Sequence, residues 1–414
     1  MDAKVKPTIG VLTAVPFIMV LGNSMLIPVL PAIQKALDVS LLQVGLLITA
    51  FSIPAGLTIP FAGMLSDHVG RKIVMVPALI VYGAGGLLAG FAALLFKENA
   101  YPYILGSRII QGIGAGGTYQ LAMALSGDLI QDRERAQALG LLEAANGLGK
   151  VVSPLAGAAI ALIAWYMPFF AYGILALPIA LAILFVAKEG SAKQKGQPLA
   201  SYFTNLLQIL KDKGVNLGIA FLCGLIVLFS LFGLLSYFSD QLEKAFHLQT
   251  FHRGLVIAVP VLAMAVTSYL FGIVLKKRMV KIMKGTILGG LALVALGLFC
   301  FPLGNGIVAK TIFATLIGAG TGMALPALNT LITSSAPTSE RGLVTCLYGT
   351  VRFFGVAIGP PLFSFATKYG TRLIFWSDVG CVAVIAALAF FLIQPQQILP
   401  ENLKGGGGQN TVKK

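Results

Sequence analysis

Charged residues are scarce in this sequence. Only 11% of the 414 residues are Asp, Glu, Lys or Arg, less than half of the ~25% that is typical of a soluble domain. Hydrophobic residues make up 57%, and this composition excludes an ordinary soluble globular protein. In a soluble protein, the excess of 30 Lys and Arg over 15 Asp and Glu would suggest a nucleic-acid partner. Here the positions of the few charges must decide what the excess means.

Residue types that bind metals or build catalytic sites are also few. The histidines lie in loops between apolar runs, and the cysteines lie inside apolar runs without CxxC spacing; they are His68, His247 and His252, and Cys223, Cys300, Cys346 and Cys381. This pattern predicts free thiols and neither a metal site nor a disulfide framework. A P-loop is absent, and the GIGAGG segment lies within an apolar run, so we predict no bound nucleotide, no cofactor and no enzymatic activity.

Long apolar runs, by contrast, are abundant. A helix needs about 20 apolar residues to cross the ~30 Å hydrocarbon core of a membrane. Twelve runs approach this length: 8–30, 41–65, 73–95, 102–126, 136–160, 165–187, 214–238, 254–275, 285–303, 306–333, 343–366 and 372–393. Loops on one side would carry 20 Lys and Arg and loops on the other side 7. This asymmetry predicts twelve spans with both termini in the cytoplasm.

The longest polar connection divides the spans into two groups of six. We predict an N-terminal six-helix bundle (1–187), a cytoplasmic linker (188–213), a C-terminal six-helix bundle (214–394) and a disordered cytoplasmic tail (395–414). The second part of the linker places Phe203, Leu206, Leu207 and Leu210 at helical spacing. An interfacial helix and an ordinary solvated linker both fit this pattern.

The two groups of spans are related by an internal repeat. The sequence aligns with itself, without gaps, at an offset of 206 residues. The matched positions are Gly112, Gly114 and Gly116 with Gly318, Gly320 and Gly322; Leu125 with Leu331; Glu134 and Arg135 with Glu340 and Arg341; Leu141 with Leu347; and Gly149 and Pro154 with Gly355 and Pro360. Six spans per copy give both copies the same orientation. The repeat therefore predicts an all-α membrane protein of two halves, related by a pseudo-two-fold axis along the membrane normal.

The loop after the second span carries a motif. It reads GMLSDHVGRK and contains Gly63, Asp67, Gly70, Arg71 and Lys72. Asp67 is placed to cap the third span at its positive dipole end, and Arg71 is placed to reach a carboxylate on a neighbouring helix end. A solvated turn with basic residues is the alternative. The segment resembles the G-x-L-x-D-x-x-G-R-K signature loop of the major facilitator superfamily.

The fourth span carries a second motif, GSRIIQGIGAGG, in which Arg108 lies about 10 Å inside the bilayer. An arginine at that depth needs a wet cavity or a partner. The segment resembles the R-x-x-Q-G motif that the same superfamily links to proton transfer. The span ends at Asp128, and the resemblance implies that Asp128 pairs with Arg71 as a cytoplasmic gate.

The fifth span, GLLEAANGLGKVVSPLAGA, resembles the superfamily's antiporter motif. Gly140, Gly149, Pro154 and Gly157 match the motif, whereas Ser153 and Ala158 replace glycines. At ~100° per residue, one face of this helix would carry the polar and small residues Glu143, Asn146, Lys150, Ser153, Pro154 and Gly157. We predict that this face lies against a cavity or a neighbouring helix.

Glu143 is the one acidic residue that the pattern places deep in a span. A carboxylate in a low-dielectric site is readily made neutral, as a proton carrier requires, and Arg108 is positioned to approach and modulate it. A buried ion pair that fixes helix packing is the alternative. Arg352 occupies the repeat position of Asn146 and is a candidate substrate or counter-ion residue, with helix packing again as the alternative.

These features predict a substrate cavity with a basic character. We expect Asn23, Asn146, Lys150 and Arg352 to line it. Asn23 stands where several cation exporters of the superfamily carry an acid. Neutral, zwitterionic or anionic substrates are therefore favoured over strongly cationic ones.

The whole-chain resemblance is to the bacterial drug:proton antiporters with twelve spans. It implies a monomer in the bacterial cell (inner) membrane that exports small hydrophobic or amphipathic solutes in exchange for protons, by alternating access. Its partners would be a small molecule, protons and the lipid bilayer, with no nucleic acid. A dedicated exporter of a sugar, metabolite or lipid, or a uniporter, remains an alternative, as does a membrane sensor or enzyme outside transport.

Overall fold

The computed structural model describes residues 6–129, 132–188, 199–335 and 341–394. Within these residues every regular element is a helix, which confirms the predicted all-α class. The helices are α1 (Lys6–Ser24), α2 (Leu30–Leu37), α3 (Leu41–Val69), α4 (Arg71–Phe96), α5 (Tyr101–Gly116), α6 (Tyr119–Leu129), α7 (Asp132–Ile160), α8 (Met167–Val186), α9 (Leu199–Lys244), α10 (Thr250–Cys300), α11 (Gly306–Ser335), α12 (Arg341–Ala366) and α13 (Thr371–Leu392). Four short 3-10 turns join them: η1 (Ile27–Val29), η2 (Lys97–Ala100), η3 (Phe301–Leu303) and η4 (Thr367–Tyr369).

Ten segments of the described chain are long and apolar enough to cross a membrane. One of them, Arg71–Leu129, contains two passes, because α4 and the α5–α6 pair run side by side in opposite directions. Helix α7, which carries Glu143 and Lys150, is outside the ten but packs within the same bundle. Many large apolar side chains face outward, for example Phe61, Phe185 and Phe391, which are 61%, 80% and 70% exposed. Outward apolar surface on this scale requires lipid around the bundle.

Some span boundaries differ from the sequence prediction. The predicted fourth span, 102–126, is broken between α5 and α6, where the Thr118 hydroxyl donates to the carbonyl of Ala115. The predicted spans 254–275 and 285–303 both fall within α10, where Thr250–Leu275 and Ile282–Leu303 are two separate segments long and apolar enough to cross a membrane. The second part of the predicted linker is helical and continues into the seventh span as α9, although the side chains of Phe203, Leu206, Leu207 and Leu210 lie outside the description. The predicted tail at 395–414 and linker residues 189–198 also lie outside the described residues.

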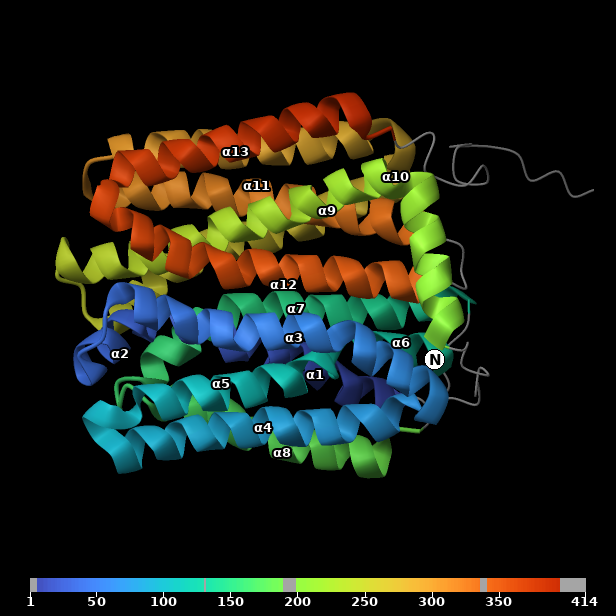
Figure 1. Cartoon of the computed structure of the whole chain (residues 1–414), viewed down its shortest axis with the longest axis horizontal. Coiled ribbons are helices and arrows are strands. Elements are labelled where there is room, and N and C mark those ends of the chain that lie inside the picture. Colours follow the sequence, from blue (N-terminus) through green and yellow to red (C-terminus); the bar gives the residue numbers. More distant parts are fainter. Residues whose placement is uncertain (1–5, 130–131, 189–198, 336–340, 395–414) are drawn as a thin grey trace, which may run out of the picture.

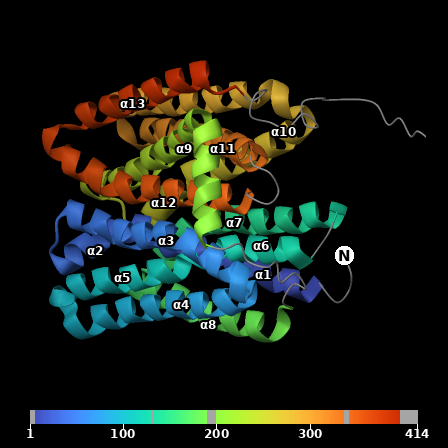
Figure 2. The same ribbon diagram turned by 45° about the vertical axis from the view of Figure 1, so that its right-hand side comes forward.

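The helices form two groups that lie side by side. In Figures 1 and 2, α1 to α8 occupy one half of the molecule and α9 to α13 the other, with α3, α7 and α12 at the boundary. The start of α1 and the end of α13 lie at the same end of the bundle, which we call the terminal end. The opposite end, where α2 lies, is called the α2 end.

Glycines at repeat-related positions make equivalent helix contacts in the two halves. A Cβ at Gly112 would lie 2.2 Å from the carbonyl oxygen of Phe51 on α3. A Cβ at its counterpart Gly318 would lie 2.0 Å from the carbonyl oxygen of Pro260, on the first part of α10. Both distances are far below van der Waals contact, so both positions require glycine.

The same correspondence holds for a second pair of helices. Gly149 of α7 packs on the backbone of Phe17 in α1, and its counterpart Gly355 of α12 packs on the backbone of Leu225 in α9. The sequence repeat therefore corresponds to equivalent helix contacts in the two halves.

The two halves meet along α3 and α12, a contact that we call the seam. Proline has no N–H and leaves the carbonyl four residues earlier without its helical donor. Pro60 of α3 frees the carbonyl of Gly56, and the Thr350 hydroxyl of α12 donates to it at 2.7 Å. Pro361 of α12 likewise frees the carbonyl of Ala357.

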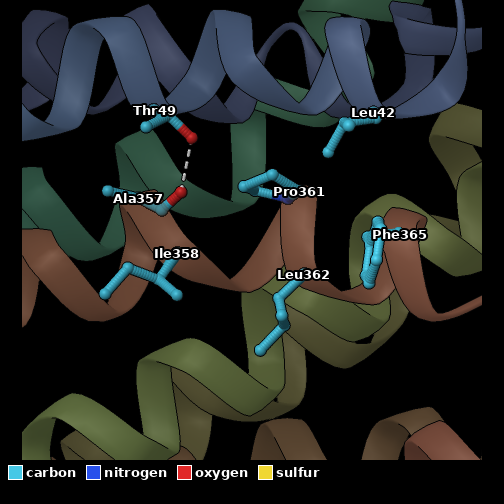
Figure 3. A pocket seen from close by; sticks show the side chains of 7 residues that line it. All are labelled: Leu42, Thr49, Ala357, Ile358, Pro361, Leu362 and Phe365. Carbon is cyan, nitrogen blue, oxygen red and sulfur yellow. Dashed lines mark hydrogen bonds between the residues drawn. The ribbon is translucent and has the colours of Figure 1, made fainter.

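In return, the Thr49 hydroxyl of α3 donates to the carbonyl of Ala357 at 2.5 Å, as Figure 3 shows. Each half thus supplies a donor to a carbonyl that a proline of the other half has freed. Beside this bond, an apolar groove of about 310 Å³ opens between the helices. It is lined by Leu42, Thr49, Ala357, Ile358, Pro361, Leu362 and Phe365.

Further contacts close the two halves together at the α2 end. The Ser239 hydroxyl at the end of α9 donates to the carbonyl of Ile27 at 2.8 Å. A Cβ at Gly254, in the first turn of α10, would lie 2.4 Å from the Cβ of Ala158 on α7. At this end, helices of the two halves are therefore in direct contact.

Candidate functional site

The signature-loop residues form a cluster at the terminal end of the first half. Gly70 joins α3 to α4 at φ 115°, a conformation that favours glycine. The expectation that Asp67 caps the following helix is wrong: Asp67 belongs to the last turn of α3, and α4 begins without a side-chain cap. Its carboxylate instead accepts from Arg71 at 2.5 Å.

Arg71 also makes the predicted contact with a neighbouring helix end. Its Nε lies 3.3 Å from Oδ2 of Asp128, near the end of α6, and its Nη1 donates to the hydroxyl of Ser66 at 2.6 Å. Lys72 donates to the carbonyl of Ala187 at 2.8 Å, just past the end of α8, where a cation complements the helix dipole. The loop thus ties α3, α4, α6 and α8 together.

This cluster also adjoins the other half. A Cβ at Gly63 would lie 3.3 Å from Sγ of Cys346 on α12. A movement of α12 relative to α3 would therefore change the surroundings of the ion pairs in the signature loop.

Arg108 lies in a fully buried polar cluster inside the first half. Its side chain is 0% exposed. It donates to Oδ1 of Asn23 and to Oε1 of Gln111, both at 2.5 Å, and to the carbonyl of Leu47 at 3.2 Å. Its guanidinium lies 4.5 Å from the centre of the Phe51 ring. A desolvated cation is stabilised here by neutral acceptors and an aromatic face.

Two predictions about this cluster do not hold in the structure. Among the described residues, Arg108 and Glu143 form no hydrogen bond or ion pair, because Arg108 is directed to α1 and α3. Asn23 does not line a cavity: it is 6% exposed and its amide donates to the Ser52 hydroxyl at 2.8 Å. Both residues are part of the core of the first half.

A second polar cluster lies between the halves. Glu143 on α7 is exposed and accepts a hydrogen bond from the Tyr119 hydroxyl of α6 at 2.5 Å. Lys150, two turns further along α7, is close enough to interact electrostatically with both Glu143 and Arg352 of α12. Tyr119 interacts with Arg352 in the same way. The predicted residues Glu143, Lys150 and Arg352 are thus brought together across the two halves.

Arg352 has only weak partners in this cluster. Its Nη1 lies 3.5 Å from Oδ1 of Asn329 on α11, its guanidinium carbon lies 5.5 Å from the centre of the Tyr348 ring, and its Nε is buried without a hydrogen bond. Neither Lys150 nor Arg352 forms an ion pair within the described part of the chain. One carboxylate is therefore accompanied by two cations, Lys150 on its own helix and Arg352 on the other side of the interface.

Sequence reasoning missed Tyr119, Asn329 and Tyr348. Tyr348 could have been predicted, because it precedes Arg352 by one helical turn and so lies on the same face of the helix. Asn146, expected in the cavity, is 7% exposed and is buried in the packing of α7.

The antiporter-motif residues have different surroundings. Gly157 packs against the backbone of Met25, and Ser153 donates to the carbonyl of Gly149 at 2.5 Å. Pro154 lies against Gly254 of α10. A Cβ at Gly140 would meet nothing within 4 Å. The motif's close contacts are therefore concentrated toward the α2 end of α7.

The family model described as the Major Facilitator Superfamily matches residues 12–360, well over half of the chain. The chain belongs to the major facilitator superfamily. This major facilitator is a multi-pass membrane protein and a transporter of small molecules rather than an enzyme.

Its curated relatives include exporters. The chain is 36% identical over 388 residues to the bacillibactin exporter of Bacillus subtilis (strain 168), covering 93% of this chain and 96% of the relative. It is 26% identical to multidrug resistance protein 2 of the same organism, covering 84% of this chain and 85% of the relative. This major facilitator is thus similar over most of its length to a bacillibactin exporter and to a multidrug resistance protein.

Solved structures agree on the fold. A bacterial homologue of the human lysosomal transporter Spinster, in an inward-facing and unoccupied conformation, matches with a TM-score of 0.77 at 17% identity, covering 97% of this chain and 99% of that one. A D-xylose-proton symporter matches with a TM-score of 0.75 at 16% identity, covering 96% and 99%. These likenesses confirm the predicted major facilitator fold.

Proposed function

We propose that this major facilitator is a proton-coupled exporter of small amphipathic molecules that works by alternating access. In this proposal it is a monomer in the bacterial cell membrane with both termini in the cytoplasm. The excess of basic residues in the loops at the terminal end supports this orientation. Glu143 is the proton carrier, and Asp67, Arg71 and Asp128 form the cytoplasmic gate.

The observation that carries the proposal is the surroundings of Glu143. Its carboxylate lies on a helix at the boundary between the halves, is exposed, and is hydrogen bonded to Tyr119. Lys150 and Arg352 lie within electrostatic reach. Uptake of a proton by Glu143 would raise the positive charge of the cluster, and release would lower it. The cluster includes residues of both halves. Protonation of Glu143 therefore changes the electrostatic interaction between the halves, and with it the relative stability of their arrangements.

The same charges bear on the substrate. Two cations beside one carboxylate, with Tyr119, Tyr348 and Asn329, favour a molecule that carries negative or hydrogen-bonding groups along with apolar surface. Exchange requires the proton and the substrate to occupy the site in turn. The ionised Glu143 carboxylate can accept a hydrogen bond from a donor group of the substrate, and protonation after the substrate has left removes that acceptor.

A second candidate is an exporter dedicated to one metabolite. The 36% identity to a bacillibactin exporter exceeds the 24% to 28% identity to the multidrug proteins, which favours a defined secreted substrate. The discriminating experiment is a panel of solutes, including bacillibactin and several lipophilic dyes, tested in proteoliposomes with an imposed pH gradient. Transport of bacillibactin alone favours the dedicated exporter, and transport of several unrelated dyes favours multidrug efflux.

The conformation also fits export. Contacts close the α2 end, whereas Glu143 is exposed. We infer that solvent reaches the central cluster from the terminal end, which in the proposed orientation is the cytoplasm. This is the state in which an exporter would collect its substrate.

The test of proton coupling is Glu143→Gln, which keeps the shape of the side chain and removes its charge change. We expect loss of efflux driven by a pH gradient in vesicles, with substrate exchange retained. Glu98→Gln is the matched control, because Glu98 is exposed on η2 at the α2 end. Native efflux by the Glu143 variant would refute the role of this carboxylate.

A further inference from the structure

A buried carboxyl group in the second half has no role in the function described above. Asp378 of α13 is 4% exposed, and neither of its carboxyl oxygens has a hydrogen-bond partner. Its neighbours one turn away on α13, Ile374 and Val382, are buried and apolar. An ionised, unpaired carboxylate in such surroundings would be very costly. The carboxyl group is therefore expected to carry a proton in this conformation.

One polar group accompanies it. Ser230 of α9 lies beside the carboxyl, is 0% exposed, and its hydroxyl also lacks a hydrogen bond of normal geometry. Both groups lose hydrogen bonds to water when they are buried, and the contact between them does not replace those hydrogen bonds. Unsatisfied buried groups of this kind are rare in native structures and call for a functional explanation.

Titratable groups on the elements around Asp378 have other partners. Tyr237 of α9 exchanges a hydrogen bond with Thr371 and accepts one from Gln241. Lys284 of α10 lies over the Phe390 ring, and Lys368 of η4 lies over the Phe365 ring. Arg372, on α13 itself, lies over the Trp376 ring, and among the described residues no cation forms an ion pair with Asp378. No charged partner therefore stabilises its ionised form in this state.

The position of Asp378 in the repeat is informative. At the offset of 206 residues it corresponds to Tyr172 of α8. Tyr172 packs against Tyr82 beside the buried Arg108 cluster. The position that holds an aromatic residue beside the Arg108 cluster in the first half thus holds a buried acid in the second half.

We propose that Asp378 and Ser230 form a second proton-binding site, separate from Glu143, which holds its proton while the α2 end is closed and releases it when that end opens. The proton leaves the Asp378 carboxyl for water, and the carboxylate that remains accepts from the Ser230 hydroxyl. Asp378 lies near the α2 end of α13, and α9 carries both Ser230 and the Ser239 contact that closes this end. Movement of α9 on opening would change the surroundings of the carboxyl group.

The experiment follows the protonated-carboxyl infrared band of the full-length protein in lipid during a pH titration. Asp378→Asn assigns the band by its loss, and Asp38→Asn, at an exposed residue of the α2 end, is the matched control. Ile27→Cys with Ser239→Cys, in a chain whose native cysteines are replaced, allows the α2 end to be locked by oxidation. We expect the Asp378 band at neutral pH, and a titration midpoint that is more alkaline in the oxidised protein than in the reduced one.

Absence of an Asp378 band from the oxidised protein at neutral pH, or equal midpoints in the oxidised and reduced proteins, overturns the proposal. Ser230→Ala provides a check that needs no cross-link: loss of the hydroxyl should shift the midpoint to higher pH, and an unchanged midpoint contradicts the role of Ser230. None of these measurements requires a substrate or Glu143. A failure of the proposed export function and a failure of this site are therefore distinguishable.

Discussion

The close contact between α7 and Met25, the residue that follows α1, provides a quantitative test of the packing. A Cβ at Gly157 would lie 2.1 Å from the carbonyl oxygen of Met25, whereas a carbon and an oxygen in favourable contact are about 3.3 Å apart. Gly157→Ala therefore forces the helices apart by about 1.2 Å, or bends them by an equivalent amount. Overpacking of this size costs about 1–3 kcal/mol.

Gly140→Ala is the matched control on the same helix, because a Cβ there would meet nothing within 4 Å. Both variants gain the same helix propensity, about 1 kcal/mol over glycine, so this contribution cancels in the comparison. We expect Gly157→Ala to be less stable than Gly140→Ala by about 1–3 kcal/mol. Thermal unfolding of the purified variants in one detergent measures the order, and export assays in vesicles show whether the displaced helix still functions.

Equal unfolding midpoints for the two variants would show that Met25 and α7 do not approach as closely as described. A lower midpoint for Gly140→Ala would contradict the reasoning more directly.

Three further outcomes are expected. Thr49→Val combined with Thr350→Val removes both hydrogen bonds of the seam and should lower the free energy of unfolding by about 0.6–1.7 kcal/mol for each bond. Thermal unfolding measures this loss, and the effects of the two single variants should add up to that of the double variant. Arg71→Ala should abolish export but leave a folded protein, because its partners Asp67 and Asp128 are partly exposed to solvent. Export at the native rate would show that Arg71 is not part of the gate. Arg108→Lys should yield little stable protein, since one ammonium cannot reproduce the directed contacts of a guanidinium, and a monodisperse variant of native stability would disprove that requirement.

The helices and their arrangement in two halves were largely predictable. Apolar runs mark the spans because lipid demands them, and the repeat at 206 residues marks equivalent glycine contacts. The same physics marks the two spans that α10 contains, Thr250–Leu275 and Ile282–Leu303. It does not reveal the break between α5 and α6, which depends on the local hydrogen bond of Thr118.

The candidate site was predictable only helix by helix. Periodicity correctly placed Glu143 and Lys150 on one face of α7, and the signature motif correctly paired Arg71 with Asp128. Periodicity does not say which neighbouring helix that face meets. For this reason Arg108 was assigned to Glu143, although it lies in another cluster with Asn23.

The two hydrogen bonds of the seam have a consequence for how the halves can move. Each bond covers a carbonyl that a proline has left bare, and a bare carbonyl in hydrocarbon costs several kcal/mol. Lipid chains entering between α3 and α12 would uncover both carbonyls at once. A rotation about the line of the seam, in contrast, can keep the short threonine hydroxyls within reach while the distant helices separate. In the proposed alternating access, the seam would therefore serve as a hinge that opposes translation of the halves away from each other, and the prolines of α3 and α12 would define where that hinge lies.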